Sequence, residues 1–242
     1  MEQPVILYED NHVIVVQKPC NMLTQSDSTG DPDLLSYVKQ YIKEKYAKPG
    51  EAYIGLVHRM DRPVGGLLVF ARTGKAAARL SDQVRVHELN RQYVCICEGQ
   101  APDAFTLTDW LVKDEETNTV KVLPEYLKAQ GKEAVLHGRC IASRDGLSLV
   151  AIQLETGRAH QIRVQMQHAG LPLWGDSRYG SGKRGQQIAL WGMRLAFTHP
   201  TTKEQMLFIA PVPEEKPWLI FEKELRGLET IWPQIRPAAK AE

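Results

Sequence analysis

Four short apolar runs, separated by polar and turn-forming segments, constrain the fold of this 242-residue chain more than any other feature. They are HVIVVQ at 12–17, LLVF at 67–70, YVCIC at 93–97 and SLVAIQLE at 148–155. Runs of this length are typical of β-strands, and VCIC, which is apolar on both sides, is typical of a central strand. Helical patterns intervene irregularly between the runs. The sequence therefore predicts an α+β protein with a mixed, mostly antiparallel central sheet and flanking helices.

Helical spacing of apolar residues appears in several segments. One predicted helix covers 34–47, with a lysine-rich face opposite its apolar stripe. Another covers 74–89, with Thr73 as its N-cap and Ala77, Leu80 and Val84 on its inner face. Further helices are predicted from Ala159 to the glycine at 170 and over 218–228, and short strands at 5–8 and 206–209. The stretch 101–148 is polar and predicts short strands and loops.

Composition bounds the organisation of the chain. A hydrophobic content of 43% and a charged content of 24% are ordinary for one globular domain, predicted here over 1–230 with a flexible tail at 231–242. The net charge of +1 does not by itself indicate a nucleic-acid partner. No signal peptide is visible, and no apolar run approaches the ~20 residues that cross a bilayer. We expect a cytoplasmic protein without a membrane partner.

Cysteine and histidine spacing argues against a metal site. Cys95 and Cys97 form a C-x-C pair inside an apolar strand, whereas zinc and redox sites favour C-x-x-C. Buried free thiols are the expectation. A site built from His58, His160 and His168 has no supporting metal motif.

The segment LVHRMDRPVGGLLVFA places Asp61 among arginines immediately before a buried strand. Pro63 and the two following glycines cannot continue a helix, so Asp61 is expected on a loop. A neighbouring positive charge favours the ionised carboxylate. A solvated surface pair between Asp61 and Arg62 remains the alternative.

The segment ETGRAHQIRVQMQ, residues 155–167, carries a second polar group. A helix beginning near Ala159 would place His160, Arg163 and Gln167 on one face. Arg158 would lie at the amino end, where free N–H groups favour an anion such as phosphate. An ordinary amphipathic helix with a wet face is the alternative.

Tyr93 heads the YVCIC strand and is a third candidate. It would converge with the aspartate and arginine if the strand ends meet at one cleft. The alternative is a tyrosine at a sheet edge, with its hydroxyl half exposed to water.

Together these segments resemble the RluA-type pseudouridine synthases. HRMDRPVGGLL is similar to that family's H-R-L-D motif with its following S-G-L-L, and RQYVCICEG to its tyrosine-bearing strand. TGRAHQIR with the later GDSRYG, VIVVQKP near the start, and FTHP at 197–200 also fit. The resemblance runs in order from about 5 to 213. Met60, Gly65, Ala159 and the pair Trp191-Gly192 depart from the usual residues and leave the subgroup open.

The resemblance implies a pseudouridine synthase fold with a catalytic cleft across the sheet, and a cofactor-free, metal-free isomerisation of uridine in RNA. It implies that Asp61 is the essential residue, that Arg163 pairs with it, and that Tyr93 stacks on the target base. The residues expected to contact substrate are His58, Arg59, Arg158, His160 and Gln161. The expected partner is ribosomal or transfer RNA. We expect a monomer without the S4-type RNA-binding domain that many relatives carry.

Two other functions remain open at this stage. A hydrolase of the N-glycosidic bond would need a second carboxylate, and Glu155 is the candidate within these segments. An RNA-binding module without catalysis would not need Asp61, Tyr93 and Arg163 together.

Overall fold

The computed structural model describes residues 3–47 and 49–235. The chain divides into two compact units: unit 1 comprises Met1–Arg91 and Gly192–Ala210, and unit 2 comprises Gln92–Trp191 and Pro211–Glu242. The single catalytic domain predicted over 1–230 spans both units and stays a prediction. Most of the predicted tail, residues 236–242, lies outside the described residues.

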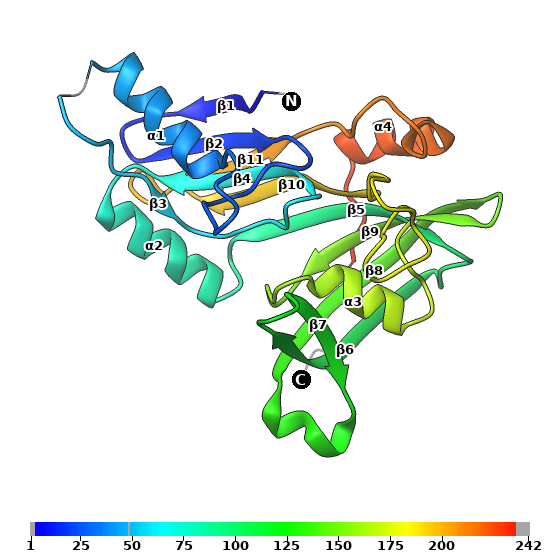
Figure 1. Cartoon of the computed structure of the whole chain (residues 1–242). Helices are drawn as coiled ribbons and strands as arrows, with labels where there is room; N and C mark the ends of the chain where they lie inside the picture. The colour runs from blue at the N-terminus through cyan, green and yellow to red at the C-terminus, as the bar shows by residue number, and fades with distance from the viewer. Residues whose placement is uncertain (1–2, 48, 236–242) are drawn as a thin grey trace, which may run out of the picture. The chain divides into compact units, whose positions relative to one another are not determined.

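Unit 1 is built on strands that pair in the order β1-β2-β4-β10, with β3 on β4 and β11 on β10 (Figure 1). Its elements are β1 (Val5–Glu9), β2 (Val13–Lys18), α1 (Leu34–Lys45), β3 (Gly55–Leu56), β4 (Gly65–Ala71), α2 (Gly74–Arg85), β10 (Leu190–Thr198) and β11 (Gln205–Ile209). Every residue of β4 is buried, as the apolar run at 67–70 predicts for a strand covered on both faces. The predicted strands at 5–8 and 12–17 are confirmed.

The two helices of unit 1 begin at side-chain caps. The Asp33 carboxylate accepts a hydrogen bond from the Ser36 N–H at 3.0 Å, and Thr73 Oγ1 accepts one from the Ala76 N–H at 3.2 Å. The predicted cap at Thr73 is thus confirmed. These bonds satisfy N–H groups that the first helical turn leaves without a backbone partner.

The predicted inner face of α2 is partly wrong. Leu80 is buried as expected, together with Ala76 and Gln83, whereas Ala77 and Val84 are only half-buried. The Gln83 amide donates to Thr198 O at 2.7 Å and accepts from Thr198 N at 2.9 Å. Gln83 is therefore buried because its side chain matches the backbone of β10, a reason that hydrophobic periodicity cannot reveal.

Unit 2 contains a second antiparallel strand series, in the order β5-β9-β8-β6-β7. Its elements are β5 (Asn90–Glu98), β6 (Ala104–Asp114), β7 (Thr119–Leu123), the 3-10 helix η1 (Glu125–Gln130), β8 (Lys132–Arg144), β9 (Leu147–Leu154), α3 (Gln161–His168), the 3-10 helix η2 (Trp218–Phe221) and α4 (Glu222–Thr230). Helix α3 packs against β6 and β7 (Figure 1). The predicted mostly antiparallel α+β class is confirmed.

The stretch 101–148 is not the set of short strands and loops that its polarity predicts. It forms β6, β7 and β8, of which β8 is 13 residues long. In β6, exposed residues alternate with partly buried ones. An antiparallel sheet with one wet face has a polar composition while remaining regular.

The carboxyl-terminal segment of unit 2 is held by hydrogen bonds from β8. Arg144 Nη1 donates to Ile220 O at 2.9 Å, and the Arg144 guanidinium pairs with the carboxylate of Glu224 in α4. Arg139 Nη1 donates to Gln234 O at 3.0 Å, and Ile235 is buried. The described start of the predicted tail therefore docks on unit 2.

Gly66 offers a direct test of the strand packing in unit 1. Its φ is +125°, and a Cβ there would lie 2.4 Å from Gly192 O. We expect Gly66→Ala to lower the free energy of unfolding by about 3 kcal/mol, because backbone strain and a clash with backbone combine. Urea denaturation of the purified protein measures this loss.

Gly74→Ala is the matched control, because Gly74 begins α2 and a Cβ there meets nothing within 4 Å. It should leave stability unchanged or raise it by up to about 1 kcal/mol. Equal stability of the two variants would contradict the close packing of β4 on β10.

Candidate active site

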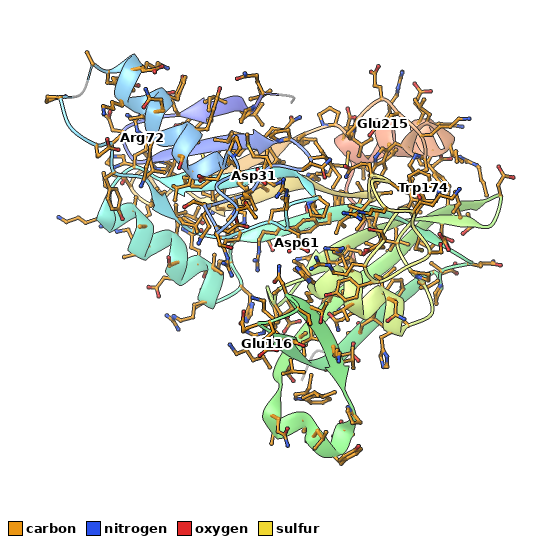
Figure 2. The ribbon with its side chains drawn as sticks, in the orientation of Figure 1. Asp31, Asp61, Arg72, Glu116, Trp174 and Glu215 are labelled. Atoms are coloured by element: carbon orange, nitrogen blue, oxygen red, sulfur yellow. The ribbon has the colours of Figure 1, made fainter. Side chains whose placement is uncertain are left out.

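Asp61 lies on the loop between β3 and β4 of unit 1, and it is half-buried (Figure 2). Its carbonyl oxygen accepts a hydrogen bond from the Val64 N–H at 3.1 Å, which closes a tight turn. The preceding residue, Met60, is buried, and both its backbone groups bind Thr24 Oγ1, at 2.8 and 3.1 Å. The loop is thus held on both sides of Asp61.

A buried lysine supports the same loop from within. Lys18, at the end of β2, is fully buried, and its Nζ donates to the carbonyl oxygens of Pro19, Met22 and Arg62 at 2.7–3.1 Å. Burial lowers the pKa of Lys18 to about 7, although the negative charge of Asp61 acts in the opposite direction. Lys18 therefore ties the start of the chain to the residue that follows Asp61.

The neighbours of Asp61 in the sequence divide into buried and exposed side chains. His58 is buried, and its Nε2 accepts a hydrogen bond from the Val69 N–H at 3.3 Å. Burial, reinforced by the positive charge of Arg91, lowers the pKa of His58 to about 3, so the ring is neutral. Arg59 and Arg62 are exposed.

Arg62 forms its ion pair with Asp31, at 2.6 Å, on a neighbouring loop (Figure 2 labels Asp31). Both side chains are close to half exposed, so the pair adds little stability. The sequence leaves open a solvated pair between Asp61 and Arg62. The structure gives Arg62 an ion pair with another carboxylate, that of Asp31.

In unit 2, Arg163 is held by a carboxylate that the sequence analysis did not single out. Arg163 Nε and Nη2 donate to the two oxygens of Asp176, each at 2.8 Å, in a bidentate pair. The side chains are 7% and 1% exposed. Burial alone would raise the pKa of Asp176, but Arg163 and the N–H groups of Arg178 and Tyr179 hold it below its usual range.

Tyr179 lies against the same guanidinium. The Arg163 Cζ is 5.1 Å from the centre of the Tyr179 ring, within cation–π range. The Tyr179 hydroxyl accepts a hydrogen bond from the Val120 N–H at 2.8 Å and lies 2.7 Å from His160 Nδ1. The Tyr179 hydroxyl therefore joins β7 to the residue before α3.

Helix α3 begins two residues later than the sequence predicts. It starts at Gln161, and His160 precedes it with a left-handed φ of 50°. His160 therefore does not share a helical face with Arg163 and Gln167. The predicted shared face is therefore wrong, because the left-handed conformation of His160 places it outside the helix. The glycine at 170, with a positive φ, ends the helix as predicted.

The side chain of Gln161, the first residue of α3, is bonded to the segment before the helix and to β8. Its Oε1 accepts from the Arg158 N–H and from Thr156 Oγ1, both at 2.9 Å, and its Nε2 donates to Val135 O at 3.1 Å. Gln161 is 3% exposed. Arg158 is exposed, and its Nε donates to Glu133 O at 2.8 Å.

Strand register places Tyr93 on the same sheet face as α3. Tyr93 pairs with Ile152, which pairs with Gly138, and Gly138 pairs with Phe105. Directly paired residues share a face, and so do residues an even number of positions apart. By that parity this face also carries Leu111 and Ala134, which pack with Val164 of α3 in one apolar cluster.

The structure therefore brings Arg163 and Tyr93 to one face of unit 2, and fixes Asp61 on a supported loop of unit 1. His58 and Gln161 are buried among protein groups. The supporting residues Lys18, Thr24, Asp176 and Tyr179 were not assigned roles from the sequence. Asp176 and Tyr179 stand in the GDSRYG segment quoted for the resemblance, which was the available signal.

The cysteine prediction is confirmed: Cys95 and Cys97 are buried free thiols. Burial raises the pKa of Cys97 to about 12. In the part of the chain that the structure describes, no three His, Cys, Asp or Glu residues are grouped to hold a metal ion. Nor does any helix within residues 3–47 and 49–235 have the length and apolar character needed to span a membrane.

Comparison with known proteins gives concordant matches. A family model described as RNA pseudouridylate synthase matches residues 12–168. Ribosomal large subunit pseudouridine synthase D of Zymomonas mobilis is 34% identical over 222 residues, covering 87% of this chain and 69% of that protein. The uncharacterized RNA pseudouridine synthase YjbO of Bacillus subtilis is 33% identical over 218 residues, covering 89% and 75%.

Among solved structures, human RNA pseudouridylate synthase domain containing 4 superimposes with a TM-score of 0.72. The match covers 91% of this chain and 92% of that one, at 18% identity. At this identity the likeness shows a common fold.

Lys18 predicts a specific pH dependence of stability. Because its pKa is about 7 in the folded state and higher when exposed, the unfolded chain binds more protons above pH 7. The contribution of Lys18 to the free energy of unfolding is therefore lowest below pH 7 and rises with pH. The difference between wild type and Lys18→Met should grow by about 2 kcal/mol from pH 7 to pH 9.

Urea denaturation at the two pH values measures this difference. Lys75→Met, which alters an exposed lysine on α2, is the control and should show no such trend. A Lys18→Met difference that stays constant or shrinks as the pH rises would contradict the buried, readily deprotonated state.

Proposed function

The chain belongs to the RNA pseudouridylate synthase family and is an RNA-modifying isomerase, and we propose that Asp61 carries its reaction. In the reaction, the N1–C1′ bond of a uridine breaks, the uracil turns while bound, and C5 bonds to C1′. The proton on C5 is then lost and N1 gains one, so the mass is unchanged. Asp61 acts at the ribose, either by adding to C1′ or by removing a ribose proton.

The observation that carries this proposal is the support of the Asp61 loop. Thr24 binds both backbone groups of Met60, and Lys18 binds the carbonyl of Arg62, so the residues on each side of Asp61 are fixed. A half-buried carboxylate on a rigid turn suits a catalytic group, because misplacement by about 1 Å can cost on the order of 100-fold in rate.

We propose that Arg163 binds Asp61 in the working enzyme. Asp176 takes the Nε and Nη2 groups of Arg163, which form one edge of the guanidinium. A second carboxylate would be bound through the Nη1 side. Such a pair would hold the carboxylate of Asp61 in place beneath a bound nucleotide.

Tyr93 is proposed to stack on the target base. Its position on the sheet face that α3 covers supports this role, because Arg163 belongs to the same helix. A base inside a helical stack cannot be turned over, so the nucleotide must be flipped into a pocket at a cost of a few kcal/mol. Stacking on an aromatic ring offsets part of that cost.

The residues first expected to contact substrate divide by exposure. Arg59 and Arg158 are exposed and suit contacts with phosphate, and half-buried His160 suits a contact at the edge of the site. His58 and Gln161 are buried and bonded to the protein's own backbone, so we propose that they hold the loop and the helix in place.

Large-subunit ribosomal RNA is the proposed substrate. The relative from Zymomonas mobilis, which shares 34% identity, is named for action on the large ribosomal subunit. We further propose that the reaction needs neither metal nor cofactor, and that the protein acts as a monomer. Size-exclusion chromatography with light scattering tests the monomer directly.

Replacement of Asp61 by asparagine tests the catalytic assignment. Asp61→Asn should abolish tritium release from RNA labelled at uridine C5, measured without added metal or cofactor, because the carboxylate is lost. RNA binding should stay within about threefold of wild type. Asp82→Asn, which alters an exposed aspartate on α2, should release tritium at the wild-type rate.

Analysis of the products separates the alternatives. Free uracil would indicate hydrolysis of the glycosidic bond, for which Glu155 is poorly suited because it already binds His137 Nε2 at 2.9 Å. Wild-type protein that binds RNA without changing it would indicate a binding module. An active Asp61→Asn variant would overturn the role of Asp61.

The hydroxyl of Tyr93 is tested by Tyr93→Phe. The ring keeps its stacking surface, so RNA affinity should be unchanged, whereas tritium release should slow by about 100-fold if the hydroxyl assists loss of the C5 proton. Tyr93→Leu should also weaken RNA binding. Tyr53→Phe, at an exposed tyrosine, is the control. A Tyr93→Phe variant with the wild-type rate would limit Tyr93 to stacking.

A further inference from the structure

Two residues that contact Arg163, Asp176 and Tyr179, have no role in the proposed reaction so far. Asp176 is 1% exposed, and its oxygens accept from Arg163 and from the N–H groups of Arg178 and Tyr179. A buried carboxylate with this many donors is fixed in position, and its charge is balanced by Arg163. Asp176 therefore sets both the plane and the rotation of the Arg163 guanidinium.

The ring of Tyr179 limits the movement of the same guanidinium. Its ring lies under Cζ of Arg163, and its hydroxyl is tied to the Val120 N–H at the start of β7 and to His160 before α3. The ring cannot turn away without breaking both hydrogen bonds. Arg163 is thus held along one edge by Asp176, and its Cζ lies over the ring of Tyr179.

Helix α3 is also anchored by contacts that do not involve Asp176. Gln165 Nε2 donates to Asp109 Oδ2 at 2.7 Å and to Ala134 O at 3.1 Å, and Val164 packs with Leu111 and Ala134. These contacts anchor the helix to β6 and β8. Asp176 and Tyr179 instead act on the end of the Arg163 side chain.

We infer that Asp176 is a positioning residue that fixes Arg163 for the reaction, with Tyr179 as its second support. The inference rests on the proposed function, since the fixed guanidinium is the one proposed to bind Asp61. Asp176 itself touches no reacting atom. Its loss should slow the chemical step while leaving RNA binding intact.

Single-turnover tritium release from C5-labelled RNA tests the inference. Asp176→Asn removes the charge and one acceptor at nearly constant shape, and should lower the maximal rate by about 100-fold with RNA affinity within threefold of wild type. Asp176→Glu restores the charge at a shifted position and should recover at least tenfold of that loss. Tyr179→Phe should slow the rate by about tenfold.

Asp109→Asn is the matched control, because it weakens a hydrogen bond to α3 without contact to Arg163. Its rate should be close to that of wild type. A wild-type rate for Asp176→Asn would overturn the inference, and so would equal losses in the two asparagine variants. If Asp176→Asn does not fold, a Tyr179→Phe variant with the wild-type rate overturns it, and the tenfold loss supports it.

A measurement independent of activity separates this inference from the proposed function. NMR of ¹⁵N-arginine-labelled protein reports rotation about the Nε–Cζ bond of Arg163. Rotation should be slow in wild type and Asp109→Asn, and fast in Asp176→Asn. Slow rotation in a wild-type protein that releases no tritium would refute the proposed function and leave the fixed guanidinium standing. Equal rotation in all three proteins would overturn the inference.

Discussion

The placement of Asp61 depends on the hydrogen bonds of Lys18. It is a fully buried amine whose hydrogen bonds end on three carbonyl oxygens, one of them on the residue after Asp61. Burying an amine is costly unless it is well bonded, and here the three hydrogen bonds offset the cost and fix two loops at one point. Thr24 holds the residue before Asp61 in the same way. The carboxylate therefore stands on a backbone that has little freedom to move.

In unit 2, a cationic side chain is held in a similar way by buried polar groups. Arg163 is buried, bonded along one edge by Asp176 and covered by Tyr179. In both units, a side chain assigned to the site in the proposal is held by polar residues to which the proposal gives no step of the reaction. If the reaction needs no cofactor, as proposed, its rate must come from the placement of charge, which fixed polar groups provide. Together, the supports at Lys18 and Asp176 connect the fold to the proposed reaction.

The sequence predicts most of the strands outside 101–148 and most of the helices, because apolar periodicity reports burial directly, but it does not predict β10. The buried strand at 67–70 is predicted for this reason, whereas the Thr73 cap is predicted because threonine is favoured at the start of a helix. The sequence does not predict that Gln83 is buried, because that burial depends on hydrogen bonds to the backbone of β10. It also does not predict long strands in the stretch 101–148, where one sheet face is exposed to water and the composition is polar. It also misses Lys18 and Asp176, whose roles depend on partners 44 and 13 positions away. Local pattern contains no information on such partners.

The central claim is that the reaction takes place at Asp61. Pseudouridine mapping of large-subunit ribosomal RNA, in cells lacking the protein and in cells supplied with wild type or Asp61→Asn, tests it most directly. The account predicts that at least one uridine loses its modification, that wild type restores it, and that Asp61→Asn does not. Restoration by Asp61→Asn would contradict the claim, and unchanged ribosomal RNA in the deficient cells would contradict the proposed substrate.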